Sequence, residues 1–147
     1  MGFQIGHVGL NVTDLERTKE FYLRVFGFDL NFESTEGDRR YASLGYDGVS
    51  MLTLWQQSEG RFATGLPGLH HVALQVPDMD AVRRAEATLQ EIGVEFAYEG
   101  VVPHAGGRQS GGVFFTDPDG IRVEIFAPTG AEALTAPVED APTCGFF

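Results

Sequence analysis

The sequence contains one pattern twice, and this repeat constrains the fold more than any other feature. The segment "IGHVGLNVTDLERTKEFYLRVFGFDL" begins at Ile5, and "LHHVALQVPDMDAVRRAEATLQEIGVEF" begins at Leu69. In register, His7 corresponds to His71, and most of the apolar residues that follow correspond as well. Each copy opens with an apolar run typical of a strand and continues with apolar residues at helical spacing.

Both helices have recognisable ends in the sequence. We expect Thr13 or Asp14 to cap the first helix, because a short polar side chain can accept a hydrogen bond from the first turn. In the second copy, Asp78 or Asp80 is in the same position. A glycine, which favours a left-handed conformation at a helix C-terminus, follows each helix: Gly27 and Gly93.

The remainder of each half repeats too. The segment "LGYDGVSMLTLW" from Leu44 matches "TDPDGIRVEIFA" from Thr116, and both place an Asp-Gly pair between β-rich runs, which indicates a hairpin. Aligned on that pair, Leu52 corresponds to Glu124. Each half therefore reads as β-α-β-β-β.

This pattern predicts an α+β fold in which two tandem β-α-β-β-β modules form a curved mixed sheet around a cleft. The first module spans residues 1–60 and the second spans 69–127, with a turn-rich linker over 61–68. Residues 128–147 are rich in Ala, Thr and Pro and read as a C-terminal tail. The tail ends in "CGFF", which is apolar enough to dock on the protein.

Composition excludes several classes of partner. The chain has 147 residues and a formal net charge of -11, with only 10 Lys and Arg residues. Nucleic acids and anionic membranes are therefore not expected as partners, because phosphate contacts need clustered basic residues. The sequence has neither a spanning apolar segment nor the pattern of a signal peptide, so we expect a cytoplasmic location. One cysteine, Cys144, excludes an intrachain disulfide.

Three residues suggest a metal site. His7 and His71 stand at equivalent strand starts, and Glu124 stands on another strand of the second half. Histidine is the commonest metal ligand near neutral pH, and two histidines with one carboxylate form the facial triad of non-haem Fe(II) oxygen chemistry. We therefore expect a divalent metal, with Fe(II) favoured and Mn(II), Zn(II) or Ni(II) as alternatives.

A structural role for the same residues is the competing interpretation. A single histidine in an apolar strand is often a hydrogen-bonded core residue. Glu124 also shares one strand face with Arg122, so that face can be solvent-exposed. The matching face of the first half, however, contains Leu52 and Leu54, which is not a solvated pattern. The sequence thus favours metal binding.

The motifs "HVGLNVTDLERTKEFYLRVFGF", "HHVALQVPDMDA" and "DPDGIRVEIF" resemble those of the vicinal oxygen chelate superfamily, the glyoxalase/bleomycin-resistance/extradiol dioxygenase family. The resemblance covers about residues 5–127. It implies paired β-α-β-β-β modules and a divalent metal held in a cleft by His7, His71 and Glu124. It also implies a homodimer, in which modules are sometimes exchanged so that one site takes ligands from both chains.

One departure from the family pattern narrows the chemistry. Glyoxalase I members usually supply a fourth ligand, a glutamate or glutamine, at the place of Leu52. Since leucine cannot coordinate a metal, the resemblance points away from a glyoxalase-type isomerase. It points instead towards extradiol ring-cleaving dioxygenases and fosfomycin-resistance transferases.

Other residues are candidates for roles around the metal. By the extradiol resemblance, His104 lies where an acid/base histidine is expected, although a loop histidine without a role is equally compatible. The expected tyrosine position is Phe114, which we assign to substrate binding, and Arg108 is the best candidate for gripping an anionic substrate. We expect His70 to point to the strand face opposite His71 and to be structural.

The leading hypothesis is a metal-dependent, extradiol-type ring-cleaving dioxygenase that acts on a small catechol-like substrate. A glyoxalase-like lyase or a fosfomycin-resistance-type thiol transferase on the same scaffold is the alternative. A non-catalytic protein that sequesters a drug or metabolite is the third possibility. Binding-only members of the superfamily tend to lack the metal ligands, and all of them are present here.

Overall fold

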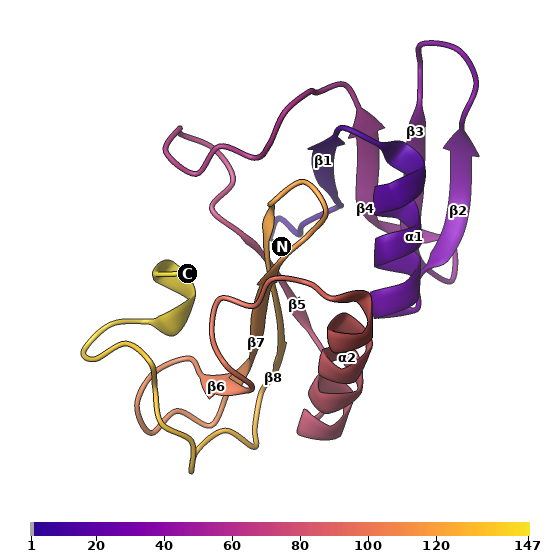
Figure 1. Cartoon of the computed structure of the whole chain (residues 1–147). Coiled ribbons are helices and arrows are strands. Elements are labelled where there is room, and N and C mark those ends of the chain that lie inside the picture. Colours follow the sequence, from indigo (N-terminus) through magenta and orange to yellow (C-terminus); the bar gives the residue numbers. More distant parts are fainter. Residues whose placement is uncertain (1) are drawn as a thin grey trace. The chain divides into compact units, whose positions relative to one another are not determined.

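The computed structural model describes residues 2–147, which form two compact units. The first unit ends at Phe62 and the second runs from Ala63 to Phe147. Each unit contains one four-stranded sheet and one α-helix in the order β-α-β-β-β (Figure 1). The predicted α+β class and the repeated module are therefore confirmed.

Unit 1 builds its sheet around the first strand and the last strand. Its elements are β1 (Val8–Val12), α1 (Leu15–Phe26), β2 (Asp29–Ser34), β3 (Tyr41–Tyr46) and β4 (Val49–Gln56). The strands lie in the order β1-β4-β3-β2, with β1 parallel to β4 and the other pairs antiparallel. Helix α1 contacts β3 and β4, because its apolar stripe needs the sheet to cover it.

Unit 2 has the same topology, with the strand order β5-β8-β7-β6. Its elements are β5 (Val72–Gln75), α2 (Met79–Ile92), β6 (Val102–Pro103), β7 (Gly111–Thr116), β8 (Arg122–Ala127) and the 3₁₀-helix η1 (Thr143–Gly145). Strand β5 is parallel to β8, and the remaining pairs are antiparallel. The only addition to the plan of unit 1 is the C-terminal tail that carries η1.

Local chemistry sets the helix ends as the sequence indicated. Asp14 caps α1 and Asp78 caps α2, and each side chain accepts a hydrogen bond from a main-chain N–H in the first turn. Gly27 and Gly93 end the helices in the left-handed conformation, with φ values of 64° and 82°. These glycines avoid the steric cost that a Cβ would add there.

The two faces of the unit 2 sheet are covered by different elements. Val123 and Ile125 on β8 are fully buried on the face that α2 contacts. Glu124 lies between them in sequence, so its side chain points to the opposite face. The tail, yellow in Figure 1, lies on the side of β7 and β8 away from α2. Glu124 is consequently buried by the tail and its neighbours and not by the helix.

A β-bulge interrupts the pairing of β3 with β4 in unit 1. Leu44 pairs with Leu52, but the next pair is Gly45 with Ser50, so Met51 is an extra residue on β4. The pairing of β7 with β8 in unit 2 continues without such a shift. A bulge of this kind adds one residue between a hairpin turn and the positions beyond it.

The bulge changes which residue corresponds to Glu124. Gly9 and Ala73 each stand two residues after the repeated histidine. Gly9 pairs with Thr53 in unit 1, whereas Ala73 pairs with Glu124 in unit 2. The alignment of Leu52 with Glu124 on the Asp-Gly turn is therefore wrong by one residue. Its consequence is unchanged, because Thr53 supplies neither a carboxylate nor an amide ligand at this position.

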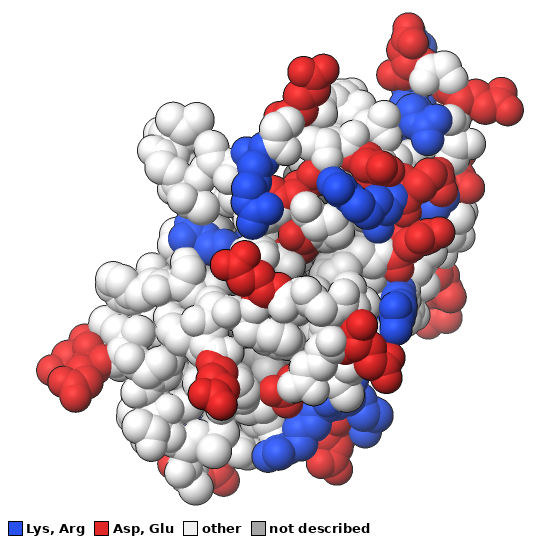
Figure 2. Space-filling view, viewed as in Figure 1, with Lys and Arg blue, Asp and Glu red and all other residues white. Residues whose placement is uncertain are grey.

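Figure 2 shows one face of the molecule with charged groups of both signs. On the face drawn in Figure 2, acidic residues outnumber basic ones, and the basic residues stand in separate groups interspersed with acidic ones. Within residues 2–147, no helix has both the length and the apolar character that crossing a membrane requires.

We predict that Gly45→Ala destabilises unit 1. A Cβ at this position would overlap the carbonyl oxygen of Val49, so the bulge has to distort to accept it. The expected loss is about 1–3 kcal/mol or more in the free energy of unfolding, the cost typical of overpacking. Urea denaturation followed by far-ultraviolet circular dichroism measures it.

Gly65→Ala is the matched control, because a Cβ at Gly65 would meet no atom within 4 Å. Its urea midpoint should equal that of the unchanged protein. Equal midpoints for both variants would show that the bulge tolerates a side chain and that glycine is not required there.

Candidate functional site

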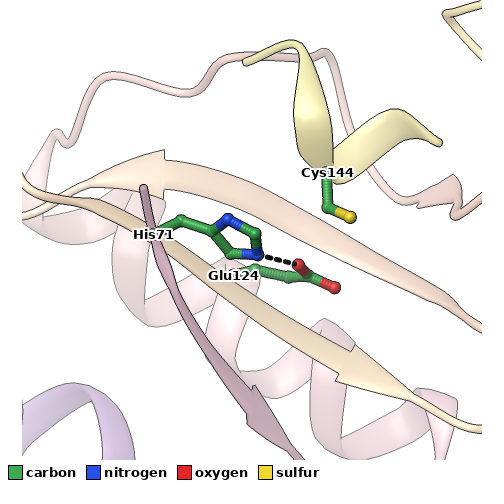
Figure 3. Close-up of side chains that lie close together, drawn as sticks. All are labelled: His71, Glu124 and Cys144. Carbon is green, nitrogen blue, oxygen red and sulfur yellow. Dashed lines mark ion pairs between the residues drawn. The ribbon is translucent and has the colours of Figure 1, made fainter. Parts of the chain in front are cut away.

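His71 and Glu124 come together on the face of the unit 2 sheet that α2 leaves uncovered. Strand β5 runs parallel to β8, and Ala73 pairs with Glu124. His71 precedes Ala73 by two residues and thus falls on the same face. Its Nε2 lies 3.5 Å from Oε2 of Glu124, and only 2% of the Glu124 side chain is exposed (Figure 3).

His104 contacts the other oxygen of the same carboxylate. Its Nε2 is hydrogen-bonded to Oε1 of Glu124, and its Nδ1 lies 2.8 Å from Oγ of Ser110. Each oxygen of Glu124 therefore faces an imidazole. A carboxylate is almost never fully buried without such partners. The sequence resemblance placed His104 near the site, but only the structure shows which atoms it meets.

Cys144 is a member of the cluster that the sequence did not single out. Donor atoms of His71, Glu124 and Cys144 all lie within 4.8 Å of one another. Figure 3 shows the thiol hanging from the η1 segment above the His71–Glu124 pair. The only sequence signal for it was the apolar "CGFF" end, which predicted docking but not where the tail would dock.

Burial and charge shift the proton equilibria of the cluster. Burial lowers the pKa of His71, the nearby Glu124 partly opposes this, and the neighbouring His70 lowers the pKa further. Burial also raises the pKa of the Cys144 thiol, and the negative charge of Glu124 adds to that effect. A lowered histidine pKa favours the neutral imidazole, which is the form that binds metal ions.

His70 does not point away from His71, and that prediction is wrong. The two Nδ1 atoms lie 2.8 Å apart. The alternation of side chains applies inside a strand, but β5 begins only at Val72. The contact occupies Nδ1 of His71 and directs its Nε2 towards Glu124. Partners of this kind commonly fix the orientation of a ligating histidine.

Phe114 lies under the cluster. It pairs with Glu124 across β7 and β8, and its side chain is fully buried. Its ring centroid lies 4.9 Å from that of Phe147 and 6.2 Å from that of His104. Phe114 therefore forms an apolar floor beside the polar groups.

Arg108 lies elsewhere in unit 2. It is exposed and lines a cavity of about 630 Å³ between the loop after β6 and the tail. Neither His71, His104 nor Glu124 lines this cavity. The structure thus brings His104 and Phe114 to the cluster, whereas Arg108 lines a separate hollow.

His7 belongs to unit 1. It directly precedes β1 and is exposed there, in the position that His71 has before β5. The structural equivalence of the two histidines, inferred from the repeat, holds within each module.

Tyr98 also lies beside the cluster, and no pattern in the sequence indicated that it would. Its hydroxyl donates a hydrogen bond to the main-chain oxygen of Thr143 at 3.1 Å, and its ring meets that of Phe114 edge-on with centroids 5.5 Å apart. Burial raises the pKa of Tyr98, and the neighbouring Cys144 adds to this. The resemblance sought a tyrosine at position 114, but the structure places one beside it, from the segment after α2.

The donor atoms of the cluster fit a divalent transition metal. Imidazole nitrogen, carboxylate oxygen and thiolate sulfur are the ligand types of Zn(II), Fe(II) and related ions. His71 contributes a ring nitrogen whose opposite side is already engaged, and Glu124 contributes a carboxylate held by His104. The donor atoms of His71, Glu124 and Cys144 already lie within 4.8 Å of one another, so only a modest movement is needed for them to surround one ion.

The chain is similar in sequence to two known proteins. Over 128 residues the chain is 31% identical to a protein named catechol-2,3-dioxygenase from Bacillus subtilis, covering 84% of this chain but only 41% of that protein. It is 30% identical to the uncharacterized protein YaeR of Escherichia coli, covering 84% of this chain and 95% of that protein.

A solved structure shows the same fold. It is a mutant of the fosfomycin resistance protein FosX from Listeria monocytogenes, complexed with Mn(II) and a dihydroxypropylphosphonic acid; it matches with a TM-score of 0.67 at 21% identity, covering 88% of this chain and 95% of that chain. The family model of the Glyoxalase/Bleomycin resistance protein/Dioxygenase superfamily matches residues 4–125. The chain belongs to that superfamily.

Proposed function

We propose that the protein is a metal-dependent, extradiol-type ring-cleaving dioxygenase that acts on a small catechol-like substrate. The observation that carries this proposal is the buried Glu124 carboxylate, 2% exposed and facing Nε2 of His71 on the helix-free face of the sheet. A buried acid between imidazoles is costly to maintain without a cation or protons to balance it.

In this proposal, His71 and Glu124 hold the metal together with His7. Fe(II) is favoured, and Mn(II), Zn(II) or Ni(II) can occupy the same ligands. When bound, a divalent metal with only three protein ligands supplies Lewis acidity and free positions for two substrate oxygens and O₂. Because His7 belongs to the other compact unit, a homodimer with exchanged modules is one way to complete the set.

The surrounding residues orient and shield the site. His104 holds Oε1 of Glu124, so acid/base work at its Nε2 requires that this contact open first. Phe114 is fully buried, so its ring can receive an aromatic substrate only in the place that the Phe147 ring occupies. Arg108 can contribute only to a substrate whose anionic group reaches the cavity beside the tail.

Two observations favour a dioxygenase over the alternatives: the similarity to a protein with that name, and a set of three proposed ligands without a fourth. The 31% identity to a protein named catechol-2,3-dioxygenase supports ring cleavage, although the chain aligns with only 41% of that protein. Thr53 at the fourth position disfavours a glyoxalase-like lyase. A fosfomycin-resistance-type thiol transferase remains the alternative, and a fosfomycin resistance protein complexed with Mn(II) has the same fold. Retention of the ligands disfavours a purely sequestering protein.

The metal site predicts a specific loss on mutation. After chelator treatment, anaerobic titration with Fe(II) should show one high-affinity site per chain, and His71→Ala should weaken it by about 100-fold or more. Removing a residue that only holds a ligand in place typically weakens metal binding by about 10–100-fold, so we expect the loss of a ligand itself to cost at least the upper end of that range. His70→Ala removes only an outer partner of His71 and should weaken binding less than His71→Ala, within the range of about 10–100-fold. Equal affinity of His71→Ala and wild type would sink the site assignment.

The reaction is tested directly on the Fe(II)-loaded protein. We expect O₂ uptake and the appearance of yellow ring-cleavage products with at least one member of a panel of substituted catechols, and neither signal with the Glu124→Gln variant. Metal binding without O₂ consumption on any catechol would shift the function to a transferase or lyase. A parallel assay of fosfomycin with Mn(II) and a thiol tests that outcome.

His104 has two separable roles, and a single variant distinguishes them. If it acts mainly by holding Glu124, His104→Ala should weaken metal affinity about 10–100-fold. If it acts mainly as an acid or base, the affinity should stay unchanged while kcat falls and its pH profile loses one limb. From the hydrogen bond to Oε1 we expect the loss of affinity. Ser110→Ala should show a weaker form of the same effect, because Ser110 contacts His104 Nδ1.

A further inference from the structure

The C-terminal tail is anchored over the Glu124 face by three hydrogen bonds at one residue. Thr143 is fully buried; its Oγ1 donates to the main-chain oxygen of Pro103 at 2.7 Å, and its N–H donates to that of His104 at 2.7 Å. Its own carbonyl accepts from the Tyr98 hydroxyl at 3.1 Å. The residue next to Cys144 is thus held in a defined position.

A second set of contacts fixes the end of the tail. The ring of Phe147 lies 4.9 Å from that of Phe114 and 5.5 Å from that of His71, measured between centroids. Arg122 donates a hydrogen bond from Nη1 to the main-chain oxygen of Phe147 at 2.7 Å. Cys144 lies between the two anchors in the sequence, and these contacts hold its thiol beside the carboxylate while the tail is docked.

The tail lies beyond the part of the chain that the family model matches. The family model ends at residue 125, and η1 with Cys144 comes after it. Unit 1, which has the same strand order, has no equivalent segment among residues 2–62. The thiol near His71 and Glu124 therefore lies outside the repeated module.

We propose that Cys144 is a thiolate ligand of the metal, so that the docked tail adds a sulfur to the donors of His71 and Glu124. This inference rests on the proposed metal site. The geometry that supports it is the cluster of three donor atoms within 4.8 Å and the anchors on both sides of the thiol.

The chemistry of the step is a ligand exchange. The Sγ–H proton would leave to solvent, Sγ would replace a water ligand of the metal, and no group would be oxidised or reduced. A thiolate is a softer ligand than a carboxylate and favours Zn(II) over Mn(II). The tail-docked protein should therefore prefer softer metals than it does when Cys144 is replaced.

Co(II) absorption tests the proposal independently of activity. Cys144 is the only cysteine of the chain, so a thiolate-to-Co(II) charge-transfer band in the near ultraviolet can come from no other residue. The chelator-treated full chain titrated with Co(II) should develop this band. Cys144→Ser should lose it and bind Co(II) about tenfold or more weakly, and its preference for Zn(II) over Mn(II) should fall.

Two further variants test whether the band depends on the docking of the tail. Thr143→Val removes the hydrogen bond to Pro103 and should weaken the band although the cysteine is still present. Phe146→Ala changes a residue that is 64% exposed and should leave the band intact. Circular dichroism of each variant shows whether unit 2 is folded.

The outcomes separate the two proposals. Co(II) binding that depends on His71 but gives no charge-transfer band in wild type overturns the ligand role of Cys144 and leaves the metal site standing. Absence of any His71-dependent Co(II) binding overturns both. The band in wild type and Phe146→Ala, with its loss in Cys144→Ser, supports the sulfur ligand.

Discussion

A carboxylate with 2% of its surface exposed has lost most of its hydration, and much of unit 2 is arranged to offset that cost. Removing a charge from water costs several kcal/mol even after the protein relaxes. Two imidazoles face the oxygens of Glu124, and His70 and Ser110 hold those imidazoles in turn. A divalent cation among these groups would turn the buried charge from a cost into a binding contribution.

The repeat shows how one topology can supply chemistry in one copy and not in the other. Both modules place a histidine before the first strand and pair that strand in parallel with the last. Only the second has an acid at the facing position, where the first has Thr53. Only the second has a tail to cover its free sheet face. The two modules share one backbone topology and differ in a few side chains. Because of these differences, every candidate ligand except His7 lies in the second module.

Features that depend on neighbouring residues were predictable from the sequence, and those that depend on distant ones were not. Asp14, Asp78 and the glycines after both helices act within one turn, so the sequence determined the helix ends. Which residue of unit 1 is equivalent to Glu124 depended on a bulge, and no local sequence pattern indicated that bulge. The docking place of Cys144 depended on contacts with segments more than 20 residues away.

The tail links the burial of Glu124 to the reactivity of the site. The same segment that shields the carboxylate from water carries the thiol, so displacing the tail would expose Glu124 and remove the thiol from it at the same time. If a catechol-like substrate packs against Phe114, as the proposed function requires, it needs the place that the Phe147 ring occupies. Under the two proposals, substrate binding and sulfur ligation would then exclude each other. The contacts of Thr143 and Phe147 would set the balance between them, because loosening either one would favour the state in which Phe114 is accessible.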